Sequence, residues 1–180
     1  MRKTLLKLIE YSILPAILLF VGKLLGLYLI ASLFGVPIDW QAQDKSLLFF
    51  STSVAKETLM LVSTYSDLFM FTLMSLGMSF ILIQAIYLHD SHISNMTISQ
   101  LAKLNLLSLI RSSFELYHSG VVWLGFLWLG SILVAINYYQ GISQLWVLLI
   151  SLLFSISFSI IFFRDLFSEI ELSKQNNYAG

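Results

Sequence analysis

The chain has 180 residues, of which 58% are hydrophobic and 11% are charged, and its ten basic and ten acidic side chains give a formal net charge of zero. Soluble globular domains carry about 25% charged residues, so this composition excludes an ordinary water-soluble fold. The basic residues are spread along the chain, which argues against nucleic acid as a partner. The absence of cysteine excludes disulfide bonds, thiolate metal sites and cysteine nucleophiles.

The first residues include Arg2, Lys3 and Lys7, which resemble the positive flank of a secretory signal. The apolar run behind them is longer than the roughly 7–15 residues of a signal peptide, so we expect an uncleaved first helix. Residues 1–14 place basic side chains among leucines and isoleucines, and this pattern predicts an amphipathic N-terminal helix. Pro15 marks the position where a new helix can begin.

Four apolar runs approach or exceed the about 20 residues that a helix needs to cross the hydrocarbon core. They cover residues 15–36, 68–88, 121–139 and 142–163. Each must be helical, because the bilayer core offers no water to the backbone polar groups. Only Gln140 and Gly141 join the last two runs, so these form an antiparallel hairpin. The sequence therefore predicts an all-α integral membrane protein, a single membrane domain over 1–180 with four transmembrane helices in an antiparallel bundle.

The segments between the spans are long enough to fold. The first part of the extracytoplasmic segment 37–67 favours a small hairpin, and a helix with Ser53 as its N-cap and Glu57 in its first turn is expected to run into the second span. Residues 89–120 form a cytoplasmic segment in which a capping box at 97–100 precedes an amphipathic helix. Residues 164–180 form a cytoplasmic tail whose polar end is expected to fray.

The distribution of basic residues predicts the orientation, because cytoplasmic flanks of membrane proteins accumulate Lys and Arg. With four spans, one side of the membrane holds Arg2, Lys3, Lys7, Lys103, Arg111, Arg164 and Lys174, and the other side holds Lys45 and Lys56. This asymmetry predicts that both termini are cytoplasmic. A short cysteine-free chain without organelle signals favours the bacterial inner membrane.

Lys23 is the single charged residue of the first span. Counted from Pro15 it lies about 12 Å deep at ~1.5 Å per residue, so its side chain can extend to the cytoplasmic interface and keep its charge hydrated. The alternative is that Lys23 faces a cavity or a carboxylate, because ionisable residues inside membranes usually serve a function. Asp67, near the outer end of the second span, is predicted to lie too far away for direct contact, which leaves another subunit as the source of a partner.

Two further patterns predict contacts between helices. Gly22 and Gly26 flank Lys23 as a small-xxx-small pair, which permits the close approach of a second helix. Serines recur every four residues in the fourth span, at Ser151, Ser155 and Ser159. We expect this stripe to pack against protein, with a polar transport path as the alternative.

All three histidines of the chain lie in the cytoplasmic segment, next to acidic residues. The candidate ligands are His89, His92, Glu115 and His118, which form two pairs with i, i+3 spacing. Imidazole and carboxylate ligands suit zinc and iron, so these residues are a candidate mononuclear metal site. The alternative is that the histidines only bridge the wet and dry parts of the interface, and no other cofactor is indicated.

The sequence favours a non-catalytic role, because no nucleophile elbow, phosphate loop or HExxH zinc motif occurs in it. We expect a subunit, scaffold or anchor of a membrane complex, in contact with the lipid bilayer and with another membrane protein or a second copy of itself. The glycine pair, Lys23 and the serine stripe are the expected contact residues. Two alternatives are a small transporter or channel subunit that uses Lys23 and the serines, and a membrane enzyme that uses the His/Glu metal site.

Overall fold

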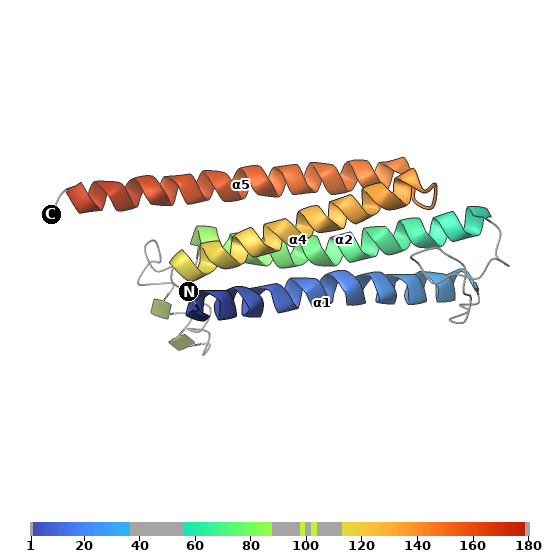
Figure 1. The fold of residues 1–180 in the computed structure, drawn as a ribbon, viewed down its shortest axis with the longest axis horizontal. Helices are drawn as coiled ribbons and strands as arrows, with labels where there is room; N and C mark the ends of the chain where they lie inside the picture. Colours follow the sequence, from blue (N-terminus) through green and yellow to red (C-terminus); the bar gives the residue numbers. More distant parts are fainter. Residues whose placement is uncertain (1, 37–55, 88–97, 100–101, 104–112, 179–180) are drawn as a thin grey trace.

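Four long helices make up the fold in the computed structural model of the chain (Figure 1). The structure describes residues 2–36, 56–87, 98–99, 102–103 and 113–178. The helices are α1 (Arg2–Leu33), α2 (Lys56–Tyr87), α4 (Ser113–Tyr139) and α5 (Leu145–Tyr178). The predicted hairpin within 37–55 and most of the cytoplasmic amphipathic segment lie outside the described residues, so those two predictions stay predictions.

The helices pack as an antiparallel bundle, with both termini at the same end (Figure 1). α2 and α4 lie in the middle, α1 contacts both of them from one side, and α5 contacts both from the opposite side. The predicted fold class is therefore confirmed. The arrangement also means that any site joining three helices must involve the central pair.

The surface and the interior of the bundle are both apolar. Met70, Met74, Met78, Leu127 and Phe162 are fully buried in the core. Large hydrophobic side chains such as Phe20, Leu76 and Leu153 are exposed on the outside. All four helices are long and apolar enough to cross a membrane. Such an exterior suits hydrocarbon, because the apolar side chains on it need no protection from water.

Three helix boundaries differ from those predicted from hydropathy. α1 is a single helix with the buried Pro15 inside it, so no new helix begins there. A proline lacks the backbone N–H that would donate to the carbonyl four residues earlier, so one hydrogen bond of the helix is lost. The residues on either side of Pro15 include strong helix formers such as leucine, which favour the continuation of the helix. α2 begins at Lys56, as the predicted helix running into the second span requires. α5 continues to Tyr178, so most of the expected frayed tail is helical; Glu169 to Asn177 contain no glycine or proline that would end a helix.

Glycines at positive φ end two of the helices. Gly35, at φ +65°, follows α1, and the Val36 amide donates to the Ala31 carbonyl at 2.9 Å. Gly141, at φ +71°, forms the turn between α4 and α5, where the Ile142 amide donates to the Asn137 carbonyl at 3.0 Å. Both are the left-handed C-terminal caps that glycine adopts without strain. The second cap makes the predicted α4–α5 hairpin and brings that turn beside α2.

A third glycine permits close helix contact in the core. The ring of Trp123 on α4 lies directly over Gly77 on α2, where a Cβ atom would overlap the ring. By contrast, a Cβ atom at Gly125, two residues further along α4, would meet nothing within 4 Å. The α2–α4 contact therefore depends on the absence of a side chain at Gly77, where the Trp123 ring packs against the backbone.

Candidate functional site

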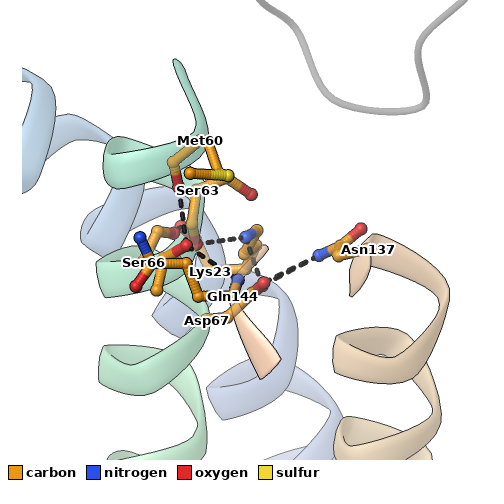
Figure 2. A network of polar contacts seen from close by, with 8 residues as sticks. Lys23, Met60, Ser63, Ser66, Asp67, Asn137 and Gln144 are labelled. Atoms are coloured by element: carbon orange, nitrogen blue, oxygen red, sulfur yellow. Dashed lines mark hydrogen bonds and ion pairs between the residues drawn. The ribbon is translucent and has the colours of Figure 1, made fainter. Parts of the chain in front are cut away.

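Three polar side chains from three helices meet near the level of the α4–α5 turn (Figure 2). The Lys23 ammonium on α1 forms an ion pair with Oδ1 of Asp67 on α2. The side-chain amide of Asn137 on α4 donates to both carboxylate oxygens, at 2.9 Å to Oδ1 and 3.0 Å to Oδ2. We call these three residues the polar triad. It ties α1, α2 and α4 together at one level of the bundle.

The polar triad is almost fully withdrawn from the surface. Asp67 is 0% exposed, Asn137 is 7% exposed, and the side chain of Lys23 is 11% exposed. A charge in such surroundings is tolerated only when it is paired and hydrogen-bonded. The carboxylate meets both conditions, since its oxygens accept from Lys23 and Asn137. The Lys23 ammonium also donates to the Ser63 carbonyl at 3.5 Å.

The register between α1 and α2 is set around Lys23. The Ser66 hydroxyl on α2 donates to the Lys23 backbone carbonyl at 3.0 Å. Gly22 and Gly26, the predicted small-xxx-small pair, both face α2. A Cβ atom at Gly26 would lie 3.1 Å from the Ser66 carbonyl oxygen, and one at Gly22 would lie 3.2 Å from the Leu73 side chain. The two backbones are therefore close enough for the lysine on one helix to reach the aspartate on the other.

The prediction that Asp67 lies too far from Lys23 for contact is wrong. Asp67 is eleven residues after Lys56, the first residue of α2, and Lys23 is ten residues before Leu33, the last residue of α1. In an antiparallel pair, these positions come to the same height. The error came from aligning the predicted start of the second span, residue 68, with the predicted end of the first span, residue 36, which put Asp67 at a different level from Lys23. The Lys23 side chain pairs within the chain and does not extend toward the N-terminal end of α1.

A cavity of about 310 Å³ opens beside the polar triad, between α1 and α4. Lys23, Asp67, Asn137 and Gln140 supply its polar lining. The remaining lining is apolar and includes Leu19, Phe20, Met70 and Leu133. The triad is thus both an interhelical tie and one wall of a cavity in the bundle.

The serine stripe of α5 faces α4. The Ser131 hydroxyl of α4 and the Ser155 hydroxyl of α5 lie 2.8 Å apart, and Ser131 also lies 3.3 Å from the Ser151 carbonyl. The Ser159 hydroxyl donates to the Ser155 carbonyl at 2.7 Å and accepts from the Trp128 indole at 3.1 Å. We call these residues the serine seam. In it, each predicted serine of α5 bonds either to its own helix or to α4.

The candidate metal ligands are only partly placed. His89 and His92 lie outside the described residues, while Glu115 and His118 lie near the start of α4. Within the described ranges, no three or more His, Cys, Asp or Glu side chains form a group that could hold a metal ion. The four-residue metal site therefore stays a prediction.

Sequence reasoning missed a second contact between α4 and α5. The Tyr117 hydroxyl donates to the Asp165 carboxylate at 2.9 Å, and its ring packs against Phe162. It also missed Asn137 of the polar triad. The available signal in both cases was a polar group within or beside an apolar run, but the partner of such a group can be found only once the helices are aligned.

No family model, curated protein or solved structure that we compared with the chain gave a match. The chemistry of the polar triad follows from its own groups: a cation, an anion and an amide that satisfy one another. Such a set fixes helices in register and presents polar atoms to the adjoining cavity.

Proposed function

We propose that the chain is a non-catalytic subunit or anchor of a membrane complex, with both termini in the cytoplasm of a bacterial cell. The observation that carries this proposal is the length of α5. Counted from Leu145, about 20 residues cross ~30 Å of hydrocarbon, which brings the helix to Arg164. α5 continues to Tyr178, about 20 Å further at ~1.5 Å per residue.

This extension of α5 is suited to contact with another protein. It passes the level at which α4 begins (Figure 1). Phe167 and Ile170 on it are 62% and 40% exposed, next to the charged residues Asp165 and Glu171. Outside the hydrocarbon, apolar side chains rimmed by charges are typical of protein-binding surfaces. A helix or groove of a partner would cover Phe167 and Ile170 together, since they are three residues apart on one face.

The polar groups inside the bundle support a structural role over a catalytic one. Lys23 and Asp67 neutralise each other, and the serines of the serine seam bond to neighbouring backbone or hydroxyl groups. The excess of Lys and Arg on one side of the predicted topology supports the cytoplasmic placement of the α5 extension. In this arrangement the bundle anchors the chain in the membrane, and the extension of α5 binds the partner protein.

The proposal is tested by extracting the tagged chain from its native membranes in a mild detergent and quantifying what co-purifies. We expect a partner at fixed stoichiometry with the unchanged chain, and its loss from Phe167→Glu. The matched control is Ser168→Ala, because the Ser168 hydroxyl donates to the Arg164 carbonyl of its own helix, at 3.1 Å. A chain that elutes alone and monodisperse, or a partner that Phe167→Glu retains, would contradict the proposal.

A further inference from the structure

The cavity between α1 and α4 has the dimensions of a ligand site. Its volume of about 310 Å³ is at the lower end of the ~300–1,000 Å³ typical of small-molecule sites. It equals about ten water volumes at ~30 Å³ each, enough for a small polar head and several methylene groups. Phe20 and Leu24, on its rim, are exposed on the outer surface of α1. A longer tail can therefore continue out of the cavity into the lipid.

Much of the apolar lining lies further from the α4–α5 turn than the polar lining does. Asn137 and Gln140 lie at the α4–α5 turn, past which α1 and α2 continue, and the rest of the triad lies beside Asn137. Leu19, Phe20 and Leu133 lie further from that turn along their helices. A lipid in a bilayer has the same arrangement, with its head at the interface and its tail toward the middle. An amphiphile of the leaflet on this side can enter without turning over.

The polar triad keeps hydrogen-bonding capacity for a ligand. An ammonium group has three N–H donors, and Lys23 directs two of them to Asp67 and the Ser63 carbonyl. Asn137 turns its NH₂ group to the Asp67 carboxylate, and its carbonyl oxygen points away from that carboxylate (Figure 2). Two residues of the cavity lining, Lys23 and Asn137, thus keep one donor and one acceptor that the triad does not use. A hydroxyl group can use both, and a carbonyl group can use the donor.

The charge of the wall selects against charged heads. Lys23 and Asp67 form a neutral pair, and the two remaining polar lining residues, Asn137 and Gln140, are uncharged. An anionic head near Lys23 would also approach the Asp67 carboxylate, and a cationic head would approach Lys23. Inside an apolar cavity, neither charge would be compensated.

We infer that this cavity binds a neutral amphiphile of the membrane, with a hydroxyl or carbonyl head against Lys23 and Asn137 and a hydrocarbon tail against Leu19, Phe20 and Leu133. The inference goes beyond the proposed subunit role and does not depend on it. A subunit with this site would carry a bound lipid-like molecule at the α1–α4 surface.

The test uses the full chain purified in detergent and native mass spectrometry to count bound molecules. The probes are monoolein as the neutral amphiphile, oleate as the anionic one and octadecane as the chain without a head. We expect one monoolein per protein, bound about tenfold or more tighter than either other probe, the ratio that one well-made set of hydrogen bonds supplies. Equal retention of octadecane would reduce the cavity to an acyl-chain groove, and preferred binding of oleate would refute a neutral head; either result overturns the inference.

Variants locate the bound molecule. Leu133→Trp fills the cavity and leaves the polar triad intact, so monoolein binding should fall about tenfold or more, as for a well-packed contact that is lost. Leu153→Trp is the matched control, because Leu153 is exposed on α5 away from the cavity, and it should bind like the unchanged chain. The pair Lys23→Met with Asp67→Leu removes the ion pair from the polar wall without leaving a buried charge, and it should lower the preference for monoolein over octadecane. If that pair fails to fold, Leu133→Trp decides: unchanged binding overturns the inference.

Discussion

The polar triad and the serine seam both join helices with buried polar groups, but they do so by different means. In the triad, Lys23, Asp67 and Asn137 each depend on a partner from another helix. In the serine seam, Ser151 and Ser159 donate to carbonyl oxygens of their own helix, at 2.9 Å to Leu148 and 2.7 Å to Ser155. A hydroxyl that can donate to a carbonyl of its own helix keeps a hydrogen bond when its partner on the other helix is removed, so little stability is lost. A charge cannot do this, so the triad should be the more sensitive of the two.

The largest effect is expected from Asp67→Leu. This change leaves the Lys23 ammonium buried without a counter-charge, and breaking a buried pair in this way costs about 3–5 kcal/mol of unfolding free energy. The measurement is reversible unfolding of the purified chain in mixed micelles, followed by circular dichroism. The double variant Lys23→Met with Asp67→Leu should be more stable than Asp67→Leu alone, because no unpaired charge is left. A double variant as unstable as the single one would show that the ion pair does not determine stability here.

The next effect is expected from Asn137→Leu. It removes two hydrogen bonds to the Asp67 carboxylate but leaves the ion pair, so the loss should be about 1.5–3 kcal/mol, the range for bonds to charged groups. Gln140→Leu is the control in the same unfolding assay, since Gln140 lines the same cavity and is exposed. If the two substitutions had equal effects, the amide of Asn137 would not be part of the tie between α2 and α4.

Shape complementarity in the central helices provides a third comparison, which involves no polar group. Gly77→Ala would place a methyl group inside the ring of Trp123, and such overpacking typically costs about 1–3 kcal/mol. Gly125→Ala is matched in chemistry but meets open space, so it should stabilise the helix by up to about 1 kcal/mol through propensity alone. Opposite signs in the same assay are the expected result. A stable Gly77→Ala would mean that Trp123 moves without loss.

The sequence was sufficient to predict the class of fold because long apolar runs have one stable form in a bilayer. It also predicted the α4–α5 hairpin, since Gln140 and Gly141 leave no room for another connection. It failed on Lys23 and Asp67 because hydropathy placed the outer ends of the first two spans at residues 36 and 68, whereas α1 ends at Leu33 and α2 begins twelve residues before residue 68, at Lys56. In an antiparallel bundle, the positions of the helix ends determine which residues of neighbouring helices lie at the same level. An error of three turns was therefore enough to separate two residues that are in contact.

The polar triad also needed a third helix that no local pattern connects to the other two. Asn137 is an amide at the end of an apolar run, and such residues are common at helix ends. Its partner is fixed by the close α1–α2 contact at Gly26 and by the turn at Gly141, where the Gln144 amide donates to the Thr64 hydroxyl at 3.1 Å. These are tertiary relations, and periodicity within one helix contains no information about them.

The smallest effect is expected from the serine seam, in the double variant Ser131→Ala with Ser155→Ala. The two hydroxyls lie 2.8 Å apart and both are buried, so removing both leaves no orphaned donor or acceptor between them. Interhelical hydrogen bonds in membranes average about 0.6 kcal/mol, and we expect a loss below about 1 kcal/mol in the same unfolding assay. Ser131→Ala alone should be at least as destabilising as the pair, because it leaves the Ser155 hydroxyl without its α4 partner. A loss as large as that of Asp67→Leu would remove the distinction between the two regions, and it would mean that buried hydroxyls hold α5 as firmly as charges hold α1.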